Sequence, residues 1–270
     1  LFIILLLLLY AILFRADLGH YGSFGGKSTR HENLIHQPVV FVHGVSDRAH
    51  DKALAAATHF YSNGYKWSEL YGTTYANGSQ GNPLQWVHYS MHCSYVKQIR
   101  ALIVAVRLYT GRAVDVIAFS LGVPIARKAI LGGECVDTRE NLGQPLTRFI
   151  DTFVGIAGPN HGITLQVSVP LCMFSVLPIC NAVNGLYSGV CPAKSIFLQD
   201  INSIANYEGR FVFSIYSKAD QLVGYLVCNQ ITTEIPGQNG GKIYENLNHD
   251  ETYYQSFDVQ RQMVLQHLIL

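Results

Sequence analysis

Ser120 lies in a short pattern that favours nucleophilic chemistry. The pattern is Ala118-Phe119-Ser120-Leu121-Gly122, and it falls between a predicted strand and a predicted helix. A serine two residues after a small residue and two before a glycine, at a strand-to-helix junction, is typical of a nucleophile elbow. Such a tight turn excludes large side chains at the flanking positions and places the hydroxyl at the positive N-terminus of the helix. Ala118 replaces the first glycine of the usual pattern, and a single methyl group is small enough for the turn.

A serine nucleophile needs a base and a carboxylate that orients the base. After an elbow of this kind, the carboxylate follows the serine in the chain and the histidine comes last. Asp220 comes four residues after a predicted strand ending at Tyr216, in a loop able to reach the catalytic edge. His249 lies between a short predicted strand and the last predicted helix, so it is the preferred base. Less suitable candidates lie inside predicted strands or deep in the last helix: Asp115, Asp151 and His267.

The segment His43-Gly44-Val45 follows the first predicted strand and can supply an oxyanion hole. A loop there can direct the backbone N–H of Val45 toward the same point as the N–H of Leu121. Two such donors stabilise a developing alkoxide by several kcal/mol. We expect His43 to be a hydrogen-bonded loop anchor. His161 precedes the aspartate in the chain, so we interpret it as a structural loop residue.

The elements that must position these residues alternate along the chain. Predicted strands cover 38–42, 113–119, 149–157, 211–216 and 242–244, and predicted helices cover 51–63, 94–110, 121–131 and 252–270. Alternating strands and helices predict an α/β fold with a mainly parallel sheet and helices on both faces. The alternation breaks after residue 158, and we interpret about 163–203 as a cysteine-bearing insertion above the sheet.

Composition limits the class of protein. Of the 270 residues, 49% are hydrophobic, which gives ample material for a core and excludes a disordered chain. Nineteen basic side chains against eighteen acidic ones leave a formal charge of +1 without any basic block. Nucleic-acid binding needs a stripe of basic residues that neutralises phosphates, so it is excluded. The length predicts a single domain over 19–270.

The first fourteen residues, 1–14, are an unbroken apolar run. A helix needs about 20 such residues to cross a bilayer, whereas the hydrophobic region of a signal peptide is shorter. We therefore interpret 1–18 as a signal peptide, truncated at its N-terminus because the chain starts with Leu. No small-x-small cleavage site follows, which leaves a signal anchor as the alternative.

The cysteines agree with secretion. Their even number, six, behind a signal peptide predicts disulfides formed in an oxidising compartment. No CxxC pair is present, so a zinc site is not expected. We expect Cys172, Cys180 and Cys191, with Cys228, to staple the insertion. Asn77-Gly78-Ser79 is a glycosylation sequon.

Four segments of the chain resemble the class 2 lipase family of α/β-hydrolases. They are PVVFVHGVSD (38–47), VDVIAFSLG (114–122), VGIAGPNHG (154–162) and IYSKAD (215–220). The family includes small secreted bacterial triacylglycerol lipases and secreted nematode proteins, and the resemblance covers about 35–165 and 205–265. It implies an α/β-hydrolase fold, no metal or organic cofactor, and a set of site residues: nucleophile Ser120, acid Asp220, base His249, and oxyanion donors Val45 and Leu121. The insertion is far longer than in the minimal bacterial enzymes.

These observations together predict a secreted serine hydrolase of carboxylic esters, with triacylglycerol lipase as the favoured activity. The expected partner is an acylglycerol or another lipid ester, presented at a lipid–water interface. A phospholipase, an esterase of soluble esters and a thioesterase are alternatives on the same residues, and a catalytically silent lipid-binding protein is an alternative of another class. The apolar segment 169–174 is a candidate wall for the acyl chain, with ordinary core packing as the other interpretation.

Overall fold

Seven strands form one twisted sheet in the part of the chain that this computed structural model describes, residues 15–29, 32–78, 83–163, 172, 177–187 and 191–269. The order is β1-β3-β2-β4-β5-β6-β9. The strands are β1 Ser23–Phe24, β2 Val39–Val42, β3 Leu70–Thr73, β4 Val114–Phe119, β5 Ile150–Ile156, β6 Phe211–Ser217 and β9 Gly240–Tyr244. Only the edge strand β1 runs antiparallel to its neighbour in this sheet; the other neighbouring strands are parallel. The predicted α/β fold with a mainly parallel sheet is confirmed.

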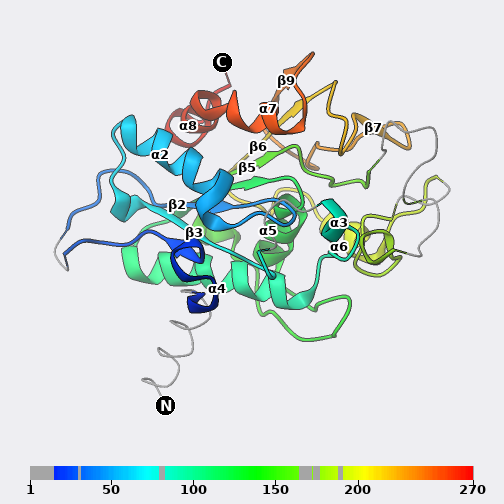
Figure 1. Ribbon diagram of the computed structural model, residues 1–270, viewed down its shortest axis with the longest axis horizontal. Helices are drawn as coiled ribbons and strands as arrows, with labels where there is room; N and C mark the ends of the chain where they lie inside the picture. The colour runs from blue at the N-terminus through cyan, green and yellow to red at the C-terminus, as the bar shows by residue number, and fades with distance from the viewer. Residues whose placement is uncertain are drawn as a thin grey trace.

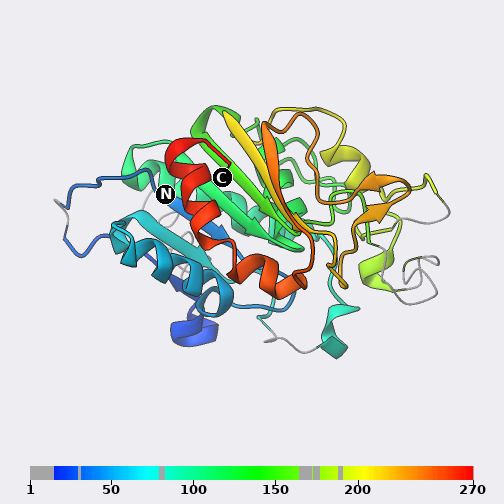
Figure 2. The same cartoon turned by 90° about the horizontal axis from the view of Figure 1, so that it is seen from above.

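Helices cover both faces of the sheet (Figures 1 and 2). One face carries α2 Leu54–Ser62, α7 His249–Tyr254 and α8 Phe257–Gln266, and the other carries α4 Cys93–Thr110 and α5 Gly122–Leu131. The short helices α3 Pro83–Trp86 and α6 Ile196–Ile201 and the hairpin of β7 Leu226–Val227 and β8 Gln230–Ile231 lie outside these layers. The described elements also include five short helical turns, Ala16–Tyr21, Ala49–Ala53, Trp67–Glu69, Thr147–Phe149 and Pro178–Cys180.

Each of the central strands β2, β4, β5 and β6 buries its two rows of side chains in two different cores. On β4, Val116 and Ala118 pack in the core beneath α4 and α5, whereas Ile117 and Phe119 pack in the core beneath α2 and α8. Because both faces are covered, the central strands are continuous apolar runs rather than alternating ones. These continuous apolar runs are the pattern from which the central strands were predicted.

The sheet places the ends of its strands where a ligand can bind. The chain passes from β2 outward to β3 and then returns to β4 on the opposite side of β2, so the loops after β2 and β4 diverge. Clefts in open α/β sheets form at such a switch point, outside the carboxyl ends of the strands. The ends of β2, β4, β6 and β9 lie at this same edge, since all four strands are parallel and neighbouring residues such as Val42 and Ala118 are in register.

Some predicted elements differ from those observed. The predicted C-terminal helix over 252–270 is wrong in its extent, because it is two helices, α7 and α8, that meet at Gln255 and Ser256. The helix predicted over 51–63 is a short helical turn, Ala49–Ala53, followed by α2. Strands β1 and β3 were not predicted. In β3, Gly72 weakens the sequence pattern, yet the fold needs it: a Cβ atom there would lie 2.5 Å from the Phe24 ring.

Three disulfides connect the six cysteines. They are Cys93–Cys135, Cys172–Cys180 and Cys191–Cys228. The four cysteines expected to staple the insertion do pair with one another, and the remaining pair ties the start of α4 to the segment after α5. Of segment 169–174, only Cys172 lies within the described residues, and it is buried.

The segment 1–14, interpreted as a signal sequence, lies outside the described residues. Arg15, which we assigned to that leader, donates hydrogen bonds to the carbonyl oxygens of Thr74 (2.7 Å) and Ala76 (2.6 Å). The chain therefore contacts the folded domain from residue 15 onward. Within the described ranges, no helix combines the length and the apolar character that crossing a bilayer requires.

Candidate active site

Ser120 occupies a sharp turn between β4 and α5. Its backbone has φ of +52°, in the left-handed region that residues with a Cβ atom seldom adopt. The turn brings α5 very close to the end of β2, because a Cβ atom on Gly122 would lie 2.3 Å from the carbonyl oxygen of His43. Only glycine fits at 122. The geometry is that of the nucleophile elbow expected from the sequence.

A chain of hydrogen bonds joins the three side chains selected from the sequence. His249 Nε2 lies 2.9 Å from Ser120 Oγ, and His249 Nδ1 lies 2.7 Å from Asp220 Oδ2. All three residues are buried. Residues separated by 100 and 129 positions from the serine thus meet at one edge of the sheet. The residues expected to act as nucleophile, base and orienting carboxylate are thus within direct hydrogen-bonding distance of one another.

Local structure fixes the carboxylate and the imidazole in these positions. The other carboxylate oxygen of Asp220, Oδ1, accepts hydrogen bonds from the backbone N–H groups of Leu222 and Val223, both at 2.9 Å. His249 is the first residue of α7, which begins with a capping box between Asn248 and Glu251. The capping box therefore fixes the position of His249 in the first turn of α7. Asp220 uses one carboxylate oxygen to hold its own loop and the other to contact His249.

His43 and Tyr75 fix the peptide that links Gly44 to Val45. The carbonyl oxygen of Gly44 accepts hydrogen bonds from His43 Nδ1 (2.8 Å) and from the Tyr75 hydroxyl (3.1 Å). His43 Nε2 accepts from the backbone N–H of Tyr75 at 3.1 Å, so the neutral imidazole carries its proton on Nδ1. Burial lowers the pKa of His43 to about 4, which agrees with that neutral form. His43 is the loop anchor that the sequence predicted.

The orientation of this peptide matters because its N–H belongs to Val45. The C=O and N–H groups of a trans peptide point in opposite directions. With the Gly44 oxygen held by His43 and Tyr75, the Val45 N–H is turned away from them. The other expected donor, Leu121, directly follows Ser120 and precedes α5.

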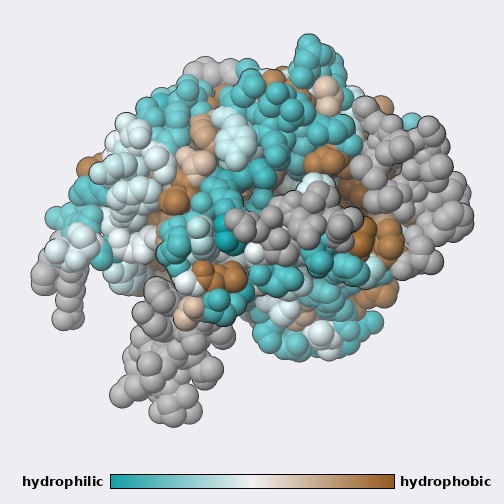
Figure 3. Space-filling model, in the orientation of Figure 1, coloured by the Kyte–Doolittle hydropathy of each residue, from teal (hydrophilic) through white to brown (hydrophobic). Residues whose placement is uncertain are grey.

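A pocket of about 340 Å³ opens beside Ser120 and His249. Most of the side chains that line it are apolar, among them Trp86, Leu121, Ile163, Ile179, Leu186 and Val223. On the face shown in Figure 3, hydrophobic residues gather on the right, near α3 and α6 in Figure 1, whereas the surface over α7 and α8 is mainly hydrophilic. An apolar pocket with a few convergent polar groups is typical of a site for a small organic ligand.

Sequence analysis missed three charged residues of this pocket: Asp47, Lys52 and Asp250. Asp47 and Asp250 follow closely after His43 and His249, so their proximity to two selected residues was the available signal. Tyr75 was missed as well, because nothing in the pattern around it marks the loop in which it contacts Gly44.

His161 lies apart from the hydrogen-bonded chain. Its Nδ1 is 3.0 Å from Lys194 Nζ, and its backbone N–H donates to the Thr232 hydroxyl at 3.3 Å. Burial, with the Lys194 charge beside it, lowers the pKa of His161 to about 4. These contacts fit the structural loop role expected for this residue.

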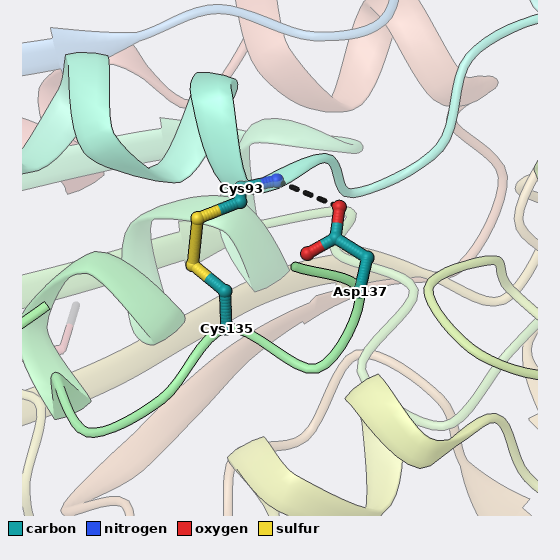
Figure 4. A group of neighbouring side chains, drawn as sticks. All are labelled: Cys93, Cys135 and Asp137. Carbon is teal, nitrogen blue, oxygen red and sulfur yellow. Dashed lines mark hydrogen bonds between the residues drawn. A yellow bond between two sulfur atoms is a disulfide. The ribbon is translucent and has the colours of Figure 1, made fainter. Parts of the chain in front are cut away.

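One group of possible metal ligands occurs among the described residues, namely Cys93, Cys135 and Asp137. Figure 4 shows why it is not a metal site: the two sulfur atoms form a disulfide, so neither offers a thiolate. Asp137 Oδ2 instead accepts a hydrogen bond from the backbone N–H of Cys93 at 3.0 Å. The group stabilises the start of α4.

Comparisons with known proteins bear on the family and on the fold. The family model described as lipase (class 2) matches residues 36–262. No curated protein matches the chain at a significant level of sequence similarity.

Solved structures share the fold at low sequence identity. Lipase B of Aspergillus fumigatus is 12% identical with a TM-score of 0.57, and the match covers 89% of this chain and 56% of that one. The mature lipase BlEst2 of Bacillus licheniformis is 14% identical with a TM-score of 0.55, covering 90% of this chain and 97% of that one. A sugar hydrolase of Lactococcus lactis is 10% identical with a TM-score of 0.51, covering 91% and 97%. This chain thus spans little more than half of the fungal lipase.

Proposed function

Because the chain belongs to the class 2 lipase family and is therefore an ester hydrolase, we propose that it cleaves acylglycerols with Ser120 as nucleophile, His249 as base and Asp220 as orienting acid. The observation that supports these roles most strongly is the hydrogen-bonded chain from Asp220 through His249 to Ser120, in the wall of an apolar pocket. The pocket suits an acyl chain, since burial of apolar surface favours binding.

The reaction proceeds through an acyl-enzyme. His249 Nε2 takes the proton of Ser120 as Oγ attacks the ester carbonyl, and the same nitrogen then returns the proton to the departing alcohol. Water enters next, loses a proton to His249 and attacks the acyl group, which releases the fatty acid and restores the serine. Asp220 holds the imidazole in the tautomer that presents Nε2 as the base, and stabilises the imidazolium that forms.

The backbone N–H groups of Val45 and Leu121 are the proposed oxyanion donors. Each tetrahedral intermediate carries a negative oxygen, and two donors aimed at it in advance lower the barrier by several kcal/mol. The support for Val45 is the double hydrogen bond on the Gly44 oxygen, which holds the peptide in one orientation. Leu121 directly follows the nucleophile, as the second donor of an elbow does.

We also propose that the protein is secreted. Three disulfides are typical of proteins that fold in an oxidising compartment. Asn77, the acceptor residue of the sequon, is exposed. A glycan there is compatible with the fold, and the expected substrate is then an extracellular lipid ester.

The test replaces Ser120 with alanine and measures hydrolysis of a triacylglycerol emulsion and of a soluble nitrophenyl ester. We expect kcat to fall by roughly six orders of magnitude, because the three residues act as a unit. An unchanged thermal unfolding curve controls for misfolding. Substantial remaining activity would remove Ser120 from the mechanism. Inactivity of the unaltered protein on carboxylic esters, phospholipids and thioesters alike would favour a silent lipid-binding protein.

A further inference from the structure

Three charged side chains form one wall of the otherwise apolar pocket; we name Asp47, Lys52 and Asp250 the charged wall. Lys52 Nζ lies 3.1 Å from Asp47 Oδ1 and 3.5 Å from Asp250 Oδ1. Two carboxylates therefore share one ammonium group. When both carboxylates are ionised, the wall carries one net negative charge and a surplus of hydrogen-bond acceptors.

Asp47 is the most deeply placed of the three, with 7% of its surface exposed. Its Oδ1 is paired with Lys52, whereas its Oδ2 has no hydrogen-bond partner among the residues that the structure describes. Gly44 opens the way from this oxygen toward the nucleophile: a Cβ atom at 44 would lie 3.2 Å from Asp47 Oδ2 and 3.1 Å from Ser120 Cβ. An acceptor on a side chain that lines the pocket, without a partner among the described residues, is a binding group for a donor on the ligand.

The charged wall lies on the side of the pocket where the alcohol part of an ester must be. His249 has to return its proton to the leaving oxygen, so the alcohol lies next to the imidazole. Asp250 directly follows His249 in α7, and the Phe119 ring lies 4.8 Å from the imidazole ring. Lys52 Nζ lies 5.7 Å from the centre of that same Phe119 ring. The charged wall and the imidazole thus share one side of the site.

We propose that the charged wall is a subsite for an uncharged alcohol with free hydroxyl groups, such as the glycerol part of a monoacylglycerol. The proposal rests on the hydrolase function proposed above and narrows its substrate class. The hydroxyl groups of the alcohol donate to the carboxylates of Asp47 and Asp250, and Lys52 holds both carboxylates in place. Hydrogen bonds to charged groups are stronger than those between neutral groups.

Two other kinds of alcohol fit the charged wall less well. The alcohol released from a triacylglycerol still carries two acyl chains, which would cover the charged side chains without hydrogen-bonding to them. A phosphorylated alcohol brings negative charge toward two carboxylates, and like charges repel. The charged wall therefore favours esters whose alcohol part carries free hydroxyl groups, and the apolar part of the pocket favours an acyl chain on the other side of the ester.

The test compares kcat/KM for three esters of one acyl chain, 1-lauroylglycerol, ethyl laurate and 1-lauroylglycerol 3-phosphate, each at concentrations at which it is monomeric in solution. We expect lauroylglycerol to exceed each of the other two by about tenfold, the size of a hydrogen bond to a charged group. In Asp47→Asn, which keeps the shape but removes the charge, the ratio of lauroylglycerol to ethyl laurate should fall about fivefold. The matched control is Asp258→Asn, which changes an exposed carboxylate of α8. It should leave the ratio of lauroylglycerol to ethyl laurate unchanged.

The ratio of two kcat/KM values measured on one preparation does not depend on the fraction of protein that is active. Partial misfolding of a variant therefore cannot lower this ratio. Equal kcat/KM values for lauroylglycerol and ethyl laurate, or a ratio unaffected by Asp47→Asn, would overturn the subsite while leaving the hydrolase intact. Preference for the phosphate ester would show that Lys52 binds an anion, and would also overturn it. Absence of hydrolysis of all three esters would instead contradict the proposed function.

Discussion

Asp220 divides its two carboxylate oxygens between the loop and the histidine. Since Oδ1 accepts from Leu222 and Val223 and Oδ2 contacts His249, replacement by asparagine keeps an acceptor for the loop while changing the partner of the imidazole. An amide nitrogen facing Nδ1 favours the wrong tautomer. We expect Asp220→Asn to lower kcat by about 10⁴-fold, as in other triads. Initial rates on a soluble ester measure this.

His161 provides the control for that substitution. It lies in the loop after the central strand β5, but it contacts Lys194 and Thr232 rather than Ser120. We expect His161→Ala to change kcat by less than about tenfold, because no step of the reaction uses its imidazole. If the effects of the two substitutions were reversed, the assignment of acid and base would be wrong.

His43 connects protonation with stability. Its pKa is lowered by burial to about 4, against about 6.5 in an unfolded chain. Between these values the unfolded chain binds a proton that the folded one does not. The free energy of unfolding therefore decreases as the pH falls from about 6.5 to 4, by up to about 3 kcal/mol from this residue. Above pH 6.5, where His43 is neutral in both states, its burial does not reduce the free energy of unfolding.

Urea denaturation at pH 7 and pH 5 tests this prediction. His43→Gln does not titrate, so its unfolding free energy should decrease less over this interval than that of the unaltered protein, by about 2 kcal/mol. Comparison of slopes removes the contribution of His161, whose lowered pKa acts in the same direction in both proteins. Equal decreases in the two proteins would show that the pKa of His43 is the same in the folded and the unfolded chain.

Residues were predictable where a local pattern marks them. Ser120 stands out through its turn, and His249 through its place between a strand and a helix. Asp47 and Lys52 belong to no such pattern, because their place in the pocket beside Ser120 depends on the course of one loop. For Asp47 it also depends on the missing side chain of Gly44. Tyr75 could not be found for the same reason.

At the scale of elements, burial on both faces decided what could be predicted. The strands β2, β4, β5 and β6 are covered on both sides and appear as apolar runs. Edge strand β1 has only two residues, and its neighbour β3 contains Gly72, so neither shows such a run. The break between α7 and α8 involves neither proline nor glycine, which is why one long helix was expected.

The disulfides stabilise their elements to different extents. Cys93–Cys135 spans 42 residues and Cys172–Cys180 spans 8. Restricting the unfolded chain over these distances contributes about 4 and about 2.5 kcal/mol, respectively. We therefore expect the double variant Cys93→Ala with Cys135→Ala to lose more stability than Cys172→Ala with Cys180→Ala. Urea denaturation of both variants measures the two losses, and a larger loss in the second variant would contradict this ranking.

At the scale of the whole molecule, the order of the strands explains the site. The chain supplies Val45, Ser120, Asp220 and His249 after β2, β4, β6 and β9, and the parallel sheet collects these four positions at one edge. Alternating strands and helices were enough to predict this edge. They do not reveal the shape of the pocket, because the insertion contributes to its lining and has no regular pattern of its own.

The central claim is that Ser120, activated by His249, is the nucleophile of a hydrolase. Incubation of the folded protein with a fluorophosphonate probe, followed by mass mapping of the adduct, tests it most directly, because such probes react with an activated serine. We predict one adduct, on Ser120, that is lost after denaturation and in His249→Ala. No adduct, or an adduct on another residue of the folded protein, would contradict the claim.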